Sequence, residues 1–116
     1  MAFSRSMKHL VAGLAAAWLC AGAAWAQDKP TIRLLVGFPP GGGTDVMARL
    51  VGEKMATALN ATVVVENKPG AGGRVAAETL KNGAADGSLV LITPPAPIVI
   101  APFTFSKLPY SPETDF

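Results

Sequence analysis

The amino-acid sequence predicts an α/β fold built as a parallel β-α-β-α-β unit. Three short runs rich in strand-forming residues, 31–38, 62–66 and 88–93, are separated by two segments with helical periodicity. Each of the first two runs ends in a glycine-rich stretch that leads into the next helix. Strands and helices that alternate through short connections favour parallel strands with right-handed crossovers.

The first strand and the first helix are expected over residues 31–38 and 44–59. The strand is apolar at consecutive central positions, which is typical of a strand buried on both faces. Prolines and glycines then end it, and Thr44 and Asp45 offer a helix N-cap followed by an acidic first turn. The apolar face of the helix is expected to comprise Val46, Leu50, Val51, Met55, Ala58 and Leu59.

The second half of the unit repeats this order. A strand over 62–66 leads into a glycine-rich loop over 67–73 and a short helix over 74–81, capped by residues 82–83. A turn then precedes the third strand, 88–93. The residues expected to face inward on the second helix are Val75, Ala76, Thr79 and Leu80.

Residues after the third strand are expected to be irregular. Four prolines at positions 94, 95, 97 and 102 argue against a regular helix, with residues 98–100 as buried packing between them. Residues 105–116 read as a polar loop without a closing element. Because parallel sheets normally have more than three strands, the chain is expected to be an N-terminal fragment of a longer protein.

Residues 1–26 have the organisation of a cleaved secretory signal peptide. A short basic segment precedes an apolar run over residues 10–23, and residues 24–26 form the small-x-small site that places cleavage before Gln27. An uncleaved membrane anchor is the alternative, although the apolar stretch is at the short limit for spanning a bilayer.

Without this leader the charge of the chain is balanced. Lys plus Arg fall from 10 to 8, while Asp plus Glu stay at 8. The sequence therefore lacks the clustered basic residues that nucleic-acid binding requires. The single Cys and the single His both lie in the leader, so no metal site, no cofactor and no catalytic constellation is expected, and the protein is predicted not to be an enzyme.

Both glycine-rich stretches lie at the carboxyl ends of predicted strands, directly before helices. In an open parallel sheet, ligands bind at that edge. Glycines let a ligand approach the backbone closely, and the first turn of a helix favours an anion. The two loops therefore predict a site for an anionic ligand, with simple tight turns as the alternative interpretation.

Two side chains are candidate ligand contacts at the same edge. Arg74 opens the second helix, where it could clamp a carboxylate; a solvated arginine on an exposed turn is the alternative. Thr93 ends the third strand and offers a hydroxyl, although threonine is also common at strand ends.

A nucleotide-binding, Rossmann-like enzyme fragment is the competing interpretation. Gly41 and Gly43 match the first half of a dinucleotide motif, but Val46 stands where the third glycine is required. No lysine follows Gly43, as a phosphate-binding P-loop requires. Glu66 does stand near the expected position of a ribose-binding acid, so this alternative stays open.

Three segments, in order, resemble the Bug-type extracytoplasmic solute receptors, which are the substrate-binding proteins of tripartite tricarboxylate transporters. The segments are residues 32–45, residues 64–73, and residues 107–112 followed by Asp115 and Phe116. The match covers nearly the whole chain after the leader. Arg74 departs from the family pattern, which often has a smaller polar residue there.

The resemblance implies a two-lobed, Venus-flytrap periplasmic binding fold. Residues 27–116 would form part of the first lobe, with the second lobe absent. The implied ligand is a small carboxylate, such as a di- or tricarboxylate, an acidic amino acid or a related organic acid, held between the lobes. The positions that would line the site are Phe38, Pro39, Pro40, Gly41, Gly42, Gly43, Thr44, Asp45, Gly70, Ala71, Gly72, Gly73, Arg74 and Thr93.

The resemblance also implies a biological setting. The receptor would work as a monomer in the periplasm and would hand its ligand to the membrane permease subunits of a tripartite transporter. A truncated, non-functional receptor remnant is the remaining alternative.

Overall fold

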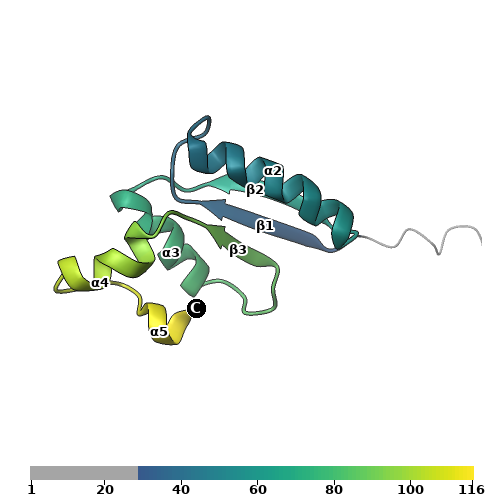
Figure 1. Ribbon diagram of the computed structural model, residues 1–116. Coiled ribbons are helices and arrows are strands. Elements are labelled where there is room, and N and C mark those ends of the chain that lie inside the picture. Colours follow the sequence, from purple (N-terminus) through teal and green to yellow (C-terminus); the bar gives the residue numbers. More distant parts are fainter. Residues whose placement is uncertain (1–28) are drawn as a thin grey trace, which may run out of the picture.

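The computed structural model describes residues 29–116 and has the predicted α/β fold (Figure 1). Three parallel strands form one sheet in the order β2-β1-β3. The predicted signal peptide and cleavage site, residues 1–26, lie outside the described residues. The elements are β1 (Thr31–Val36), α2 (Gly43–Ala58), β2 (Thr62–Asn67), η2 (Ala71–Gly73), α3 (Arg74–Lys81), β3 (Leu89–Ile92), η3 (Ala96–Ile100), α4 (Ala101–Thr104) and α5 (Pro112–Asp115).

The central strand β1 is buried on both faces, as its sequence predicts. Leu34 and Val36 form one side of the core with Ala48 of α2, and Leu35 is equally inaccessible to solvent. Figure 1 places α2 on one side of the sheet and α3 on the other. Because successive side chains of a strand point to opposite faces, β1 provides packing surface to both helices.

The prediction of which face of the first helix is buried is wrong. Asp45, Ala48 and Gly52 are its buried residues. A Cβ at Gly52 would lie 3.2 Å from Cγ1 of Val63, so the small residues allow α2 to lie close against the sheet. The larger apolar side chains consequently point outward: Val46, Leu50, Val51 and Leu59 are between 39% and 61% exposed. The helix begins at Gly43 with Gly42 as its N-cap, so Thr44 is not the cap.

The prediction of an irregular segment after β3 is also wrong. Residues Ala96–Ile100 form a π-helical turn that continues into the short helix α4, with a proline in the first turn of each. Proline is compatible with these positions because the first N–H groups of a helix have no partner within it. Val99 and Ile100 are at least half exposed, and Pro97 and Ala101 are buried in their place.

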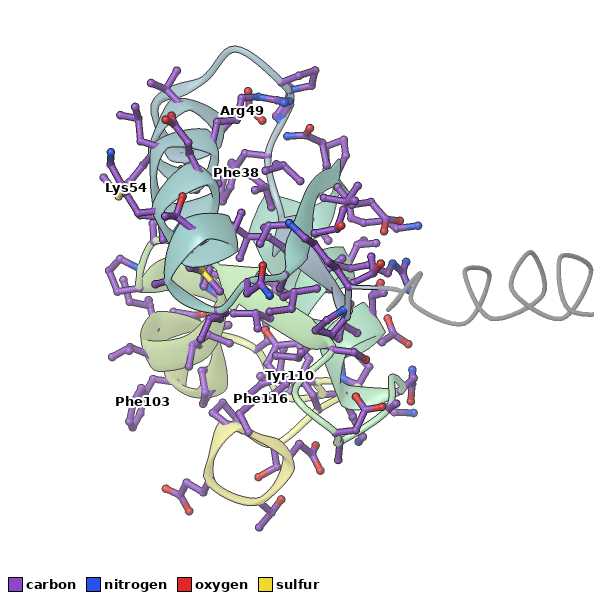
Figure 2. The ribbon with its side chains drawn as sticks, turned by 90° about the vertical axis from the view of Figure 1, so that its right-hand side faces the viewer. Phe38, Arg49, Lys54, Phe103, Tyr110 and Phe116 are labelled. Atoms are coloured by element: carbon purple, nitrogen blue, oxygen red, sulfur yellow. The ribbon has the colours of Figure 1, made fainter. Side chains whose placement is uncertain are left out.

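The C-terminal segment closes on the rest of the structure instead of ending as an open loop. Tyr110 is buried, and its hydroxyl donates a hydrogen bond to the carbonyl oxygen of Pro97. Its ring lies 5.6 Å from that of Phe116, and the short helix α5 lies between them in sequence. Figure 2 shows these two rings together, whereas Phe103 points away from the body.

Candidate ligand-binding site

Three loops meet at the carboxyl edge of the sheet. All three strands point the same way in Figure 1, and the loops that follow them leave from one edge. A Cβ added at Gly37 would lie only 2.7 Å from Cα of Gly73, so the loops after β1 and β2 touch backbone to backbone. Gly73 also lies against Phe38 and Pro97. The parallel topology therefore brings together the segments that the sequence singles out.

The first loop, residues 37–42, leads into α2 and leaves donors at the start of the helix. No side chain caps the helix, and its first internal hydrogen bond runs from the N–H of Val46 to the carbonyl of Gly42. Within residues 29–116 the N–H groups of Gly43 and Thr44 therefore have no acceptor. Gly41, Gly42 and Gly43 are exposed, so this positive end of the helix is open to an anion.

Asp45 fixes the shape of the first loop from inside. Its carboxylate accepts the N–H of Gly41 at 2.9 Å, the Arg49 guanidinium at 2.9 and 3.0 Å, and the side-chain amide of Asn67 at 2.9 Å. Asp45 and Arg49 thus form an ion pair between positions i and i+4 of α2. The hydrogen bonds from Arg49, Gly41 and Asn67 hold the pKa of Asp45 well below its usual range. Its side chain is only 4% exposed, so Asp45 positions the loop.

Asn67 is the residue that sequence reasoning missed. It ends β2, and its amide also donates to the carbonyl oxygen of Phe38 at 3.1 Å. It therefore ties the strand end of the second loop to the first loop. The single signal available in the sequence was a polar residue at a strand end, a position at which many residues have no functional role.

The second loop, residues 68–73, has a different backbone. Four consecutive residues from Gly70 to Gly73 have φ between 47° and 146°, including the non-glycine Ala71. The N–H of Gly73 donates to Gly70 and that of Arg74 donates to Ala71. This loop consequently uses more of its own donors than the first loop does, and it turns directly into α3.

Arg74 stands at the first position of α3, and its guanidinium carbon lies 3.8 Å from the centroid of the Phe105 ring. Burial raises the pKa of the Tyr110 hydroxyl, and the positive charge of Arg74 acts in the opposite direction. The structure therefore places this cation beside the second loop, against the segment that follows α4.

Thr93 opens the third loop, residues 93–95, and carries a buried hydroxyl without a partner. Among the side-chain atoms of residues 29–116, its Oγ1 is the one buried oxygen or nitrogen that makes no hydrogen bond. Buried polar groups are nearly always satisfied by protein or water. The hydroxyl is thus an unused donor at the same edge of the sheet.

The remaining predicted site residues lie on the first two loops. Pro39 and Pro40 are exposed beside the half-buried Phe38, and Ala71 and Gly72 are exposed on the second loop.

Glu66, the candidate ribose-binding acid, is already engaged by two cations. Lys68 binds it at 2.9 Å and Arg33 at 2.5 Å; the hydrogen bonds from Lys68 and Arg33 lower the pKa of Glu66 and occupy its carboxylate. Nothing in this arrangement favours ribose binding.

The described part of the chain offers neither a metal centre nor a membrane span. Residues 29–116 contain no group of three or more His, Cys, Asp or Glu side chains placed to hold a metal ion. None of the helices within these residues has the length and apolar character needed to cross a bilayer.

Comparison with known proteins identifies the family. Residues 47–116 match the tripartite tricarboxylate transporter family receptor, TctC. The chain belongs to this family. The Bug-type resemblance is thereby confirmed, since protein BugT of Bordetella pertussis is 40% identical over 68% of this chain. A UPF0065 protein of Bordetella bronchiseptica is 38% identical over 98% of it.

These curated relatives are much longer than the chain. The matched region spans 37% of the B. bronchiseptica protein and 24% of BugT. The chain therefore corresponds to between about a quarter and two fifths of a family member.

Solved structures share the same fold. MatC from Rhodopseudomonas palustris, with bound malate, superimposes with a TM-score of 0.70 and 37% identity, over 74% of this chain and 29% of MatC. The R. palustris protein Rpa4515, with adipate, gives 0.66 and 28%, over 79% of this chain and 30% of that protein. Both of these neighbours were solved with dicarboxylates.

Proposed function

We propose that this chain supplies ligand-binding loops of an extracytoplasmic receptor for a small carboxylate. Residues 27–116 form part of its first lobe, and the carboxylate binds at the carboxyl edge of the sheet. The receptor releases its ligand to the membrane permease of a tripartite transporter and performs no chemistry on it.

The observation that carries this proposal is the open first turn of α2. Gly43 and Thr44 present N–H groups without acceptors among residues 29–116, at the positive end of a 16-residue helix. Backbone N–H groups at the positive end of a helix bind a carboxylate without a charged side chain.

The known relatives support the ligand class and the compartment. MatC and Rpa4515 were solved with malate and adipate, two small dicarboxylates. Another structural neighbour, BugD, is a periplasmic binding protein. These relatives favour a periplasmic protein, and our proposal includes removal of residues 1–26 and a monomeric receptor that contacts its permease.

The substitution Gly43→Pro tests the proposal because it removes one donor and leaves the helix intact. Proline is favoured at the first position of a helix, and Gly42 has φ −77° and ψ 166°, which suits a residue before proline. A Cβ at Gly43 would meet nothing within 4 Å. The matched control is Gly43→Ala, which keeps the N–H.

The measurement is isothermal titration of a carboxylate panel into the protein expressed from its own gene. The panel contains malate, adipate, citrate, glutamate and nicotinate. We expect one member to bind, Gly43→Ala to bind it with equal affinity, and Gly43→Pro to bind it about 10-fold more weakly at an unchanged melting temperature. Binding of none of these acids by the wild-type protein would contradict the carboxylate assignment, and equal binding by both variants would exclude this donor.

A further inference from the structure

Arg74 is held in a way that leaves its hydrogen-bond donors available. Its guanidinium lies over the ring of Phe105, 3.8 Å from the ring centroid. The attraction acts between the positive charge and the face of the aromatic ring, so it requires none of the five N–H donors of the guanidinium. The aromatic contact thus fixes the cation and reduces its contact with water without using its donors.

No acidic partner neutralises this arginine within the described residues. The ion pairs of residues 29–116 involve Arg33, Arg49, Lys68 and Lys81, and Arg74 takes part in none of them. Its side chain donates no hydrogen bond there either, in contrast to Arg33 and Arg49, which each donate two. Arg74 is therefore a half-buried cation whose charge is not compensated.

The position of Arg74 relates it to the candidate site. It directly follows Gly73, the residue at which the first two loops touch and which also lies against Pro97. The open donors of α2 follow the first loop, and the cation follows the second. The Gly37–Gly73 contact thus brings the backbones of the two loops together, and the Arg74 side chain extends from there to Phe105.

We propose that Arg74, positioned by Phe105, makes this receptor selective for ligands that carry a second carboxylate. The proposal rests on the proposed function, because it assigns the second negative group of the ligand bound there. The α2 donors hold the first carboxylate, and the guanidinium takes the second through charge-assisted, bidentate hydrogen bonds. Phe105 lowers the cost of binding because the guanidinium is already ordered.

Matched acids that differ by one carboxylate test this selectivity. In 2-hydroxybutyrate a methyl group replaces one terminal carboxylate of malate, and in hexanoate a methyl group replaces one terminal carboxylate of adipate. Isothermal titration is performed with the protein expressed from its own gene. We expect the diacid of at least one pair to bind about 10- to 100-fold more tightly than its monoacid in the wild-type protein.

Three variants at the two positions separate charge, geometry and positioning. Arg74→Gln should reduce the preference to less than about threefold while the affinity for the monoacid is unchanged. Arg74→Lys should retain part of the preference, since it keeps the charge and loses the planar fork. Phe105→Leu should weaken diacid binding by about threefold to tenfold. The control, Arg33→Gln, removes an arginine that is paired with Glu66, and it should change nothing in binding.

The outcomes distinguish the two proposals. If the wild-type protein binds neither member of either pair, the carboxylate assignment fails for these acids and the selectivity falls with it. If it binds them but Arg74→Gln, folded by its melting temperature, keeps the full diacid preference, the role of Arg74 is refuted and the receptor assignment stands. Loss of monoacid affinity in step with diacid affinity would instead mean that Arg74 supports the loop structurally.

Discussion

The two glycine-rich loops look alike in sequence but need their glycines for different reasons. In the first loop and at the start of α2, a Cβ at Gly42 would come no closer than 3.5 Å to another atom, and one at Gly41 or Gly43 would meet nothing within 4 Å, although Gly41 has a φ of 85°. In the second loop, Gly70 and Gly73 have positive φ, and a Cβ at either would come within 3.2 Å of a neighbour.

The two loops therefore differ in whether their glycines expose the backbone or allow close packing. The first loop is shaped by side chains, chiefly Asp45 and Asn67, and Gly41 and Gly42 leave its backbone open to solvent. The second loop is shaped by its own left-handed backbone, and its glycines permit close contact between loops. Loss of a backbone donor at the start of α2, as in Gly43→Pro, should therefore affect binding, whereas side chains added at Gly70 or Gly73 in the second loop should affect stability.

The largest effect is expected at Gly37, where the two loops touch. In Gly37→Ala, the new Cβ would lie 2.7 Å from Cα of Gly73, and backbone cannot move aside as a flexible side chain can. We expect a loss of about 3 kcal/mol in the free energy of unfolding, measured by urea denaturation. Gly43→Ala is the control and should be close to neutral. A loss below about 1 kcal/mol for Gly37→Ala would show that the loops are not rigidly packed.

Gly73→Ala should have the next largest effect on stability. Its φ of 91° is unfavourable for alanine, and its Cβ would lie 3.2 Å from the side chains of Phe38 and Pro97. We expect a cost of about 2 kcal/mol by the same denaturation measurement. Gly72→Ala, with positive φ but no close neighbour, should cost about 1 kcal/mol. Equal losses for both variants would mean that the contacts of Gly73 contribute nothing.

Asp45→Asn tests whether side chains hold the first loop. The folded-state pKa of Asp45 is lowered, so its contribution to stability is complete above the ordinary carboxyl pKa of 3.8 and is lost as the pH falls below that value. We expect the Asp45→Asn variant to melt several degrees lower than wild type near neutral pH, with the gap narrowing as the solution is acidified below the ordinary carboxyl pKa.

The control for this measurement is Asp86→Asn. Within residues 29–116 the Asp86 carboxylate accepts side-chain and backbone hydrogen bonds from Ser88, two positions further on, and these bonds lower its pKa. Its variant should show a smaller change near neutral pH. A gap that widens as the pH falls in Asp45→Asn would contradict a lowered pKa for Asp45.

Local sequence signals predicted the elements well and their packing less well. Hydrophobic runs and helical periodicity located β1, α2, β2, α3 and β3, because those patterns depend on residues close in sequence. The prediction of the buried face of α2 was wrong because that face depends on how closely the helix approaches the sheet. Gly52 fits against Val63, so a small residue is buried where the pattern favoured a large one.

For the candidate site, too, the location was predictable from the sequence and the side-chain contacts were not. Parallel topology alone places the loops at one edge, since the carboxyl ends of parallel strands meet there. The bond between Asn67 and Asp45 was not predictable, because it joins side chains 22 positions apart through tertiary structure. The same holds for Tyr110 and Pro97, whose hydrogen bond closes the C-terminal segment. That the predicted site residues contact a ligand stays a prediction.

The smallest expected effect is at Thr93, and it extends the comparison to the third loop. Thr93→Val replaces a buried hydroxyl that has no partner among residues 29–116 with a methyl group of similar size. If that hydroxyl is kept for a ligand, as we propose for the donors of α2, its removal should stabilise the ligand-free protein by about 1 kcal/mol and weaken carboxylate binding. Thermal unfolding with and without malate or adipate measures both effects. A variant that is less stable without ligand would show that the hydroxyl already has a partner, and the third loop would then resemble the second, in which the residues serve packing.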